Sequence, residues 1–305
     1  MSTSHSPTVY SHRQARSDRE RFQADGFFKF QDIIPPSLLA GLRQWVADQL
    51  HAPSDEYRAV GFQQGSAGQF AGYSNSMGLE APVVQQLLAL PALHTALDEL
   101  CRRTLLASKT LGFVTDTSRR GLPWHFGFRS FNFIDTTDMG YTLWIPLDPI
   151  DVEGQHGGIA VVPESVYSGR EESKLIGHLC HADGQSLDLD AAKRNFESFC
   201  DFRNLALEQA RVEYSFEPGD ALFFNRFVMH RSCAFREGAL PHRRAIAVRF
   251  VCASARYAPT LMNRQRALFQ RLGLGLHARA SGSMFADLAS GDRLRNSKNA
   301  RPFGR

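Results

Sequence analysis

The chain has 305 residues, of which 43% are hydrophobic and 22% are charged, and its formal net charge at pH 7 is +4. This composition is typical of a soluble globular protein, so a largely disordered chain is not expected. The positive excess is small, and no dense block of Lys and Arg lies outside the C-terminal tail. We therefore expect no nucleic-acid polymer as a partner.

The five cysteines form no CxxC pair, which disfavours a zinc knuckle and fits a reducing compartment. The first thirty residues lack the apolar segment of a signal peptide, and no apolar run reaches the length of a membrane span. These features predict a cytoplasmic protein that does not contact the membrane.

The N-terminal third is predicted to be mainly helical. Residues 1–17 lack periodicity and are expected to form a flexible arm. A helical pattern begins at Ser17 and ends at Gly26, and Phe27 begins a short strand. Further elements are expected from the apolar spacing and the Gly and Ser content: a helix from Pro36 to Leu50, a loop over 52–80 and helices over about 82–106.

After this region the pattern becomes that of short strands. Apolar or alternating runs separated by Gly, Pro and Asp occupy 110–115, 128–134, 141–147, 157–162, 211–216, 220–224 and 244–252. This spacing predicts an antiparallel sandwich or barrel. The polar, helix-prone stretch 168–210 is expected to be an inserted lid, and a helix is expected near 260–273. We therefore predict one domain over 18–280, followed by a basic, flexible tail over 281–305.

Two motifs carry residue types suited to metal chemistry. The first is Pro123-Trp124-His125-Phe126-Gly127, and the second combines Pro218-Gly219-Asp220 with His230, Ser232 and Arg243. A single His more often has a structural role than a metal-binding one, so each motif alone is a weak signal. Their order and spacing are more specific, because other segments of a known family accompany them.

The sequence resembles the phytanoyl-CoA dioxygenase family of iron(II)/2-oxoglutarate oxygenases over about Phe22 to Phe250. Besides the two motifs, the resemblance rests on segments that begin at Phe22, Leu143 and Gly157 and on the pair Arg243-Arg244. It implies a mainly β fold with flanking helices around a double-stranded β-helix of the jelly-roll or cupin-like type. It also implies that His125 and His230 bind Fe(II), and that the enzyme uses 2-oxoglutarate and O2.

The resemblance further implies a binding site for 2-oxoglutarate. Arg243 is expected to hold the distal carboxylate, because a planar guanidinium pairs well with a carboxylate. Ser232 is expected to add a hydroxyl donor, and Trp144 lies on a strand that the family uses around this cofactor. Since side chains alternate along a strand, only one of Arg243 and Arg244 can point inward, and the resemblance favours Arg243.

One departure from the family pattern concerns the third iron ligand. The family has His-x-Asp, whereas this chain has His125-Phe126-Gly127 and therefore lacks the carboxylate. Two imidazoles, a bidentate 2-oxoglutarate and oxygen leave one position of an octahedral ion open. In halogenases of this class Gly or Ala stands in the Asp position and chloride binds the iron. We therefore predict that Gly127 makes room for a halide at the reaction centre and that an unactivated carbon is chlorinated.

Two other functions remain open at this stage. A two-His hydroxylase or other oxygenase could place water, or a carboxylate from elsewhere, in the open position. A degenerate protein could keep only a binding role, although the presence of His230, Ser232 and Arg243 argues against this. The literal motif His181-Ala182-Asp183 lies in the polar insert and is interpreted as a surface feature.

The substrate is predicted to be a small molecule, either free or tethered to a carrier protein. An anionic, nucleotide-like molecule is one candidate, because several arginines flank the ligand strands: Arg119, Arg120, Arg129, Arg226, Arg231 and Arg236. Phe126, Phe128 and Arg129 are the predicted substrate contacts, although aromatic residues in a barrel more often pack in the core.

Overall fold

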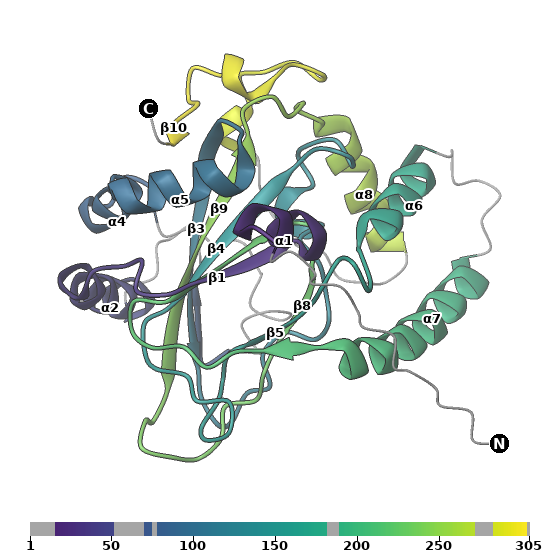
Figure 1. Ribbon diagram of the computed structural model, residues 1–305. Helices are drawn as coiled ribbons and strands as arrows, with labels where there is room; N and C mark the ends of the chain where they lie inside the picture. The colour runs from purple at the N-terminus through teal and green to yellow at the C-terminus, as the bar shows by residue number, and fades with distance from the viewer. Residues whose placement is uncertain (1–15, 52–69, 75–77, 182–188, 272–282, 304–305) are drawn as a thin grey trace, which may run out of the picture.

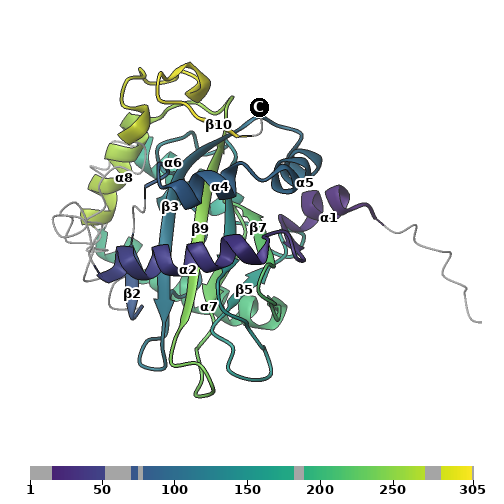
Figure 2. The ribbon, with the colours of Figure 1, turned by 90° about the vertical axis from the view of Figure 1, so that its left-hand side faces the viewer.

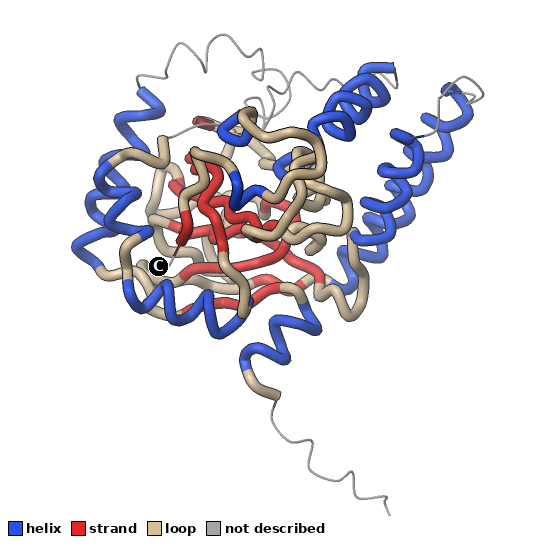
Figure 3. The backbone as a smooth tube through the Cα atoms, turned by 90° about the horizontal axis from the view of Figure 1, so that it is seen from above, coloured by secondary structure: helices blue, strands red, loops and turns tan. Residues whose placement is uncertain are grey.

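The computed structural model describes residues 16–51, 70–74, 78–181, 189–271 and 283–303. Its helices pack around two facing antiparallel sheets (Figures 1 and 3). The helices are α1 (Asp18–Asp25), α2 (Pro36–His51), α4 (Pro82–Leu88), α5 (Pro91–Cys101), α6 (Arg170–His181), α7 (Leu189–Ala210) and α8 (Pro259–Arg271). Short 3-10 helices cover Arg129–Phe131, Ser283–Phe285 and Leu294–Asn296.

The strands form a seven-stranded and a three-stranded antiparallel sheet. The large sheet has the order β1-β7-β4-β9-β3-β10, with β2 also paired to β3, and the small sheet has the order β6-β5-β8. Their bounds are β1 (Phe27–Phe30), β2 (Gly72–Ser74), β3 (Leu105–Thr115), β4 (Gly140–Pro146), β5 (Ile159–Val162), β6 (Val212–Glu213), β7 (Ala221–Asn225), β8 (Met229–Ser232), β9 (Arg243–Cys252) and β10 (Pro302–Phe303). This arrangement is the predicted double-stranded β-helix with flanking helices.

The N-terminal elements form where local sequence signals predict them. The Ser17 side chain accepts a hydrogen bond from the backbone N–H of Glu20, and the Glu20 side chain accepts one from the Ser17 N–H, so α1 begins with a capping box. Gly26 ends the helix at φ 80°, a left-handed conformation that glycine adopts without strain. The chain then enters β1, which pairs with β7.

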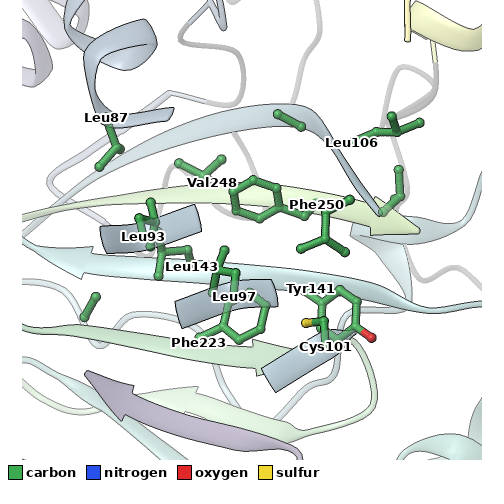
Figure 4. Close-up of a cluster of buried hydrophobic side chains, with 14 of the residues drawn as sticks. Leu87, Leu93, Leu97, Cys101, Leu106, Tyr141, Leu143, Phe223, Val248 and Phe250 are labelled. Carbon is green, nitrogen blue, oxygen red and sulfur yellow. The ribbon is translucent and has the colours of Figure 1, made fainter. Parts of the chain in front are cut away.

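The main hydrophobic core lies between the large sheet and helices α2, α4 and α5, which cover its outer face (Figure 2). Leu93 and Leu97 of α5 meet Leu143 and Phe223 of the sheet in this layer (Figure 4). Such burial removes apolar surface from water, which is the dominant favourable contribution to folding.

Strand β9 is buried on both of its faces. Ile246, Val248 and Phe250 belong to the core under the helices, whereas Ala245 and Ala247 belong to a second cluster between the two sheets. Because side chains alternate along a strand, Arg243 and Arg249 share the inward face with these two alanines. The strand therefore carries two guanidinium groups into the barrel interior.

Several elements differ from the sequence-based expectation. The sequence predicts a strand over 128–134. The structure instead has a coil that includes the 3-10 helix Arg129–Phe131, and the aromatic side chains of this run are buried. Strand β3 begins at Leu105, inside the range expected to be helical. Strand β2 lies in the predicted loop 52–80, most of which falls outside the described residues.

Part of the segment expected to be a flexible tail packs against the core instead. Phe285 and Leu294 are fully buried, and Phe303 of β10 pairs with Leu105 of β3. Polar residues separate the apolar side chains of this segment that pack against the core, so these side chains produce no periodic pattern in the sequence. The predicted N-terminal arm falls almost entirely outside the described residues.

The insert 168–210 contributes α6, which packs against α8, and α7, whose C-terminal end lies beside the small sheet (Figure 1). Among the described residues, no helix combines the length and the hydropathy that a membrane crossing requires.

Candidate active site

His125 and His230 lie opposite each other on two adjacent antiparallel segments. The backbone N–H of His125 donates to the His230 carbonyl at 2.9 Å, and the His230 N–H donates to the His125 carbonyl at 2.8 Å. This pairing places both side chains on the same face, with ring centroids 4.1 Å apart. The two predicted metal ligands, 105 residues apart in the sequence, are therefore neighbours.

Backbone carbonyls orient the two imidazoles. Nδ1 of His125 lies 2.8 Å from the Pro123 carbonyl oxygen, and Nδ1 of His230 lies 2.9 Å from that of Val228. A carbonyl only accepts, so each Nδ1 carries the proton and donates, which leaves each Nε2 with a free lone pair. The same tautomer is found in histidines that bind a metal through Nε2.

Burial keeps both imidazoles neutral. It lowers the pKa of His125 to about 4, with smaller contributions from the charges of Arg249 and Arg129. The pKa of His230 is also well below its ordinary value, first because of burial and then because of His125 and Arg249. Neutral imidazole is the form that binds a metal, so these side chains are ready ligands at neutral pH.

Gly127 lies in tight contact with another backbone segment. Its N–H donates to the Arg226 carbonyl at 2.7 Å, and a Cβ at this position would lie 3.0 Å from three Arg226 atoms, Cα, Cβ and O. Glycine therefore has a packing role here, independent of any vacant ligand position. Among the described residues, no carboxylate completes a group of three candidate ligands with His125 and His230.

Arg243 lies inside the barrel, whereas Arg244 lies at its edge. The Arg243 side chain is 3% exposed and stacks over Trp144 at 5.3 Å, and its Nη2 donates to Thr115 Oγ1 at 3.2 Å. Its Nε and Nη1 have no hydrogen-bond partner. Arg244 instead forms a bidentate pair with Asp148, at 3.0 and 2.7 Å.

The unpartnered donors of Arg243 fit a bound carboxylate. Two unpartnered donor nitrogens on a buried guanidinium are costly unless a ligand satisfies them. Ser232 lies two residues after His230 and therefore on the same face of β8. Its hydroxyl oxygen accepts from the Leu122 N–H at 3.0 Å, which leaves its own proton available to a ligand.

Arg249 is a buried cation near the two imidazoles that sequence analysis did not identify. It is 8% exposed, its Nη1 donates to Thr142 Oγ1, and its Nε has no partner. Burial lowers the pKa of its guanidinium to about 10, so it is still charged at neutral pH. None of the ion pairs between described residues includes it. The sequence signal that could have identified Arg249 is its position six residues after Arg243 on the same strand, because residues an even number apart share one face of a strand.

Of the three predicted substrate contacts, Phe126 and Phe128 point away from the two imidazoles, whereas Arg129 lies close enough for its charge to act on His125. Phe126 and Phe128 are buried with Leu207 of α7 in the cluster between the small sheet and the insert. Of their neighbours along the chain, His125 faces the opposite way, toward His230, and Gly127 lies against Arg226. Arg129 is exposed, and its charge contributes to the low pKa of His125.

Several of the arginines expected to attract an anionic substrate have partners within the protein. Arg226 donates to the carbonyls of Asp135 and Asp138, and Arg231 pairs with Glu208. Arg236 donates to three backbone carbonyls of the turn 152–154. These contacts weaken the sequence argument for an anionic substrate.

Two other groups have ligand-type side chains. His156, Glu213 and Cys233 place candidate ligand atoms within 4.8 Å of one another. However, the Gly158 N–H donates to Nδ1 of His156, so Nε2 carries the proton and faces Glu213. This tautomer, together with the pKa of Cys233, which burial raises to about 12, disfavours a metal centre. The other group, the His181-x-Asp183 motif, falls largely outside the described residues.

Comparisons with solved structures find the same fold in proteins whose descriptions name α-ketoglutarate or 2-oxoglutarate. The epimerase SnoN of nogalamycin biosynthesis, described as α-ketoglutarate dependent, matches with a TM-score of 0.62 and 16% identity, over 94% of this chain and 97% of that chain. The carbocyclase SnoK of the same biosynthesis matches with a TM-score of 0.61 and 16% identity, over 95% and 96%. EctD from S. alaskensis, solved with 2-oxoglutarate, matches with a TM-score of 0.52 and 16% identity, over 83% and 81%.

No family model and no curated protein sequence matches this chain. At 16% identity these structures show the fold, and the activity must be argued from the site itself.

Replacing either His125 or His230 with Ala should abolish binding of Fe(II) or Co(II), because a single imidazole is a weak site. Anaerobic titration calorimetry measures this directly. The control is His181→Ala, which should bind the metal like the wild type. Metal binding that survives in both site variants but is lost in the control would place the centre in the insert.

Replacing Arg243 with Met should weaken 2-oxoglutarate binding by about 2–4 kcal/mol, or roughly 30- to 1,000-fold, because a buried charge pair is lost. Arg244→Met is the matched control. It should lower the melting temperature by breaking the Asp148 pair and leave 2-oxoglutarate affinity near the wild-type value. The reverse ranking of the two affinities would assign the anchor to Arg244.

Proposed function

We propose that this protein is a non-haem iron(II)/2-oxoglutarate-dependent oxidoreductase that chlorinates an unactivated carbon of a small-molecule substrate. Its fold is that of α-ketoglutarate-dependent enzymes, and its barrel interior offers two neutral imidazoles and a buried guanidinium with unpartnered donors. When bound, Fe(II) and 2-oxoglutarate would supply the oxidation of a C–H bond by O2.

The chain's own residues have separable roles in this proposal. His125 and His230 would hold the metal through Nε2 while their Nδ1 protons stay on backbone carbonyls. Arg243 would hold the distal carboxylate of 2-oxoglutarate, with Trp144 against its guanidinium plane. The Ser232 hydroxyl would donate to the same carboxylate.

The observation that carries the halide proposal is the charge balance around the imidazoles. The usual carboxylate is absent at Gly127, and the charge of Arg249 acts on both histidines. The two imidazoles are neutral, and the metal-bound carboxylate of 2-oxoglutarate would offset only part of the positive charge of Fe(II) and Arg249. The remaining positive charge favours a small anion. Chloride would take the position of the missing carboxylate and reduce that excess.

A specific contact favours a second candidate function. The close approach of Arg226 explains Gly127 by packing alone, so the glycine need not mark a halide site. The enzyme would then be a two-His oxygenase with water in the open position. SnoN and SnoK, described as an epimerase and a carbocyclase, illustrate that this fold carries reactions other than chlorination.

Chloride dependence separates the two functions. Adding chloride to the protein with Fe(II) and 2-oxoglutarate, without oxygen, should shift the metal-to-ligand charge-transfer band in a saturable way. Arg249→Gln should weaken chloride binding about 10- to 100-fold, whereas Arg249→Lys, which keeps the charge, should retain most of it.

Gly127→Ala is a control for packing in the same titration. It adds volume against Arg226 without adding a ligand, so a loss of metal binding in this variant would assign the glycine to packing. An absorption band that does not respond to chloride in the wild type, with iron and 2-oxoglutarate bound, would favour the two-His oxygenase.

A further inference from the structure

The residues next to the two histidines form a pair on the opposite face of the small sheet. Trp124 precedes His125, and Arg231 follows His230. Because His125 and His230 are paired in antiparallel fashion and side chains alternate, Trp124 and Arg231 lie opposite each other and away from the imidazoles. The Arg231 guanidinium stacks over the Trp124 ring at 5.3 Å.

Glu208, in the last turn of α7, binds both members of this pair. Its Oε1 accepts from Trp124 Nε1 at 2.7 Å and from Arg231 Nε at 2.7 Å. Its Oε2 accepts from Arg231 Nη2 at 2.9 Å. One carboxylate therefore bridges the segment before the first histidine and the strand after the second.

Packing around Glu208 and the charge of its carboxylate stabilise its contacts with Trp124 and Arg231. Leu207, the neighbour of Glu208, is 1% exposed and packs in the same cluster as Trp124. Hydrogen bonds from Arg231 hold the pKa of the Glu208 carboxyl below its usual range, so it is ionised at neutral pH. Charge-assisted, bidentate hydrogen bonds of this kind are stronger and more directional than neutral ones.

The other charged groups around Arg231 complete a balanced network. Arg231 Nη2 also donates to Glu213 Oε1 at 3.3 Å, and Arg231 Nη1 lies 3.4 Å from Cys233 Sγ. Arg211 Nη1 lies 3.6 Å from Glu208 Oε2. Two carboxylates thus face two guanidiniums. Without Glu208, Arg231 would keep the Ser232 carbonyl at 3.1 Å and the contacts to Glu213 and Cys233, but it would lose its bidentate carboxylate partner.

We propose that Glu208 is a positioning residue that fixes the relative placement of the two histidine-bearing segments and ties the last turn of α7 to the metal centre. The proposal rests on metal binding by His125 and His230 but not on halogenation. Glu208 contacts neither imidazole, so it acts through Trp124 and Arg231. By reciprocity, metal binding stabilises the attachment of α7 as much as the attachment favours metal binding.

The test uses Co(II) as the probe, without 2-oxoglutarate or oxygen. Glu208→Gln keeps the shape but removes the charge, and Asp201→Asn makes the same change at an exposed position of the same helix. Glu208→Gln should weaken Co(II) binding about 10- to 100-fold and shift the visible absorption of the bound ion. Asp201→Asn should change neither.

Hydrogen exchange supplies a second readout. In the wild type, Co(II) should slow exchange of the amides in the last turn of α7, and in Glu208→Gln this protection should be lost. A different result would overturn the proposal. If Glu208→Gln lowers the melting temperature but keeps the wild-type Co(II) affinity, absorption spectrum and protection of the α7 amides, Glu208 is only a structural residue. Because chloride takes no part in this experiment, that result would leave the halide question open to its own test.

Discussion

The two backbone hydrogen bonds between His125 and His230 are the constraint on which the candidate site depends. They set the distance between the imidazoles and direct both to the barrel interior. The same pairing sends Trp124 and Arg231 to the outer face, where Glu208 of α7 binds them. A change in this pairing would therefore alter both the placement of the two imidazoles and the attachment of α7.

Strand β9 supplies the electrostatic counterpart of that pair. Its outward residues pack under α2, α4 and α5, and this packing fixes the register that turns Arg243 and Arg249 inward. Each guanidinium has a nitrogen donor without a hydrogen-bond partner, so the barrel interior holds positive charge that a bound anion would compensate. Two separate cations suit two anions, a dicarboxylate at Arg243 and a small ion nearer the histidines at Arg249.

The sequence predicted those features that depend on interactions between neighbouring residues. The start of α1 at Ser17, its end at Gly26 and the alternation that separates Arg243 from Arg244 are readable because neighbouring residues produce them. The coil at Arg129–Phe131, the close approach of Arg226 to Gly127 and the contacts of Glu208 depend on segments far apart in the chain. A buried run of aromatic residues has the sequence pattern of a strand, and only its tertiary contacts show that it coils. A glycine at the position of a metal-binding carboxylate can likewise be required by packing alone.

The central claim is that an anion completes the metal site beside His125, His230 and Arg249. Diffraction from crystals grown with Co(II), 2-oxoglutarate and bromide tests it most directly, because the anomalous signal of bromine locates the ion without ambiguity. We expect one bromide bound to the metal on the Gly127 side, within reach of Arg249. A water molecule or a protein carboxylate in that position, with no bromide near the metal, would contradict it.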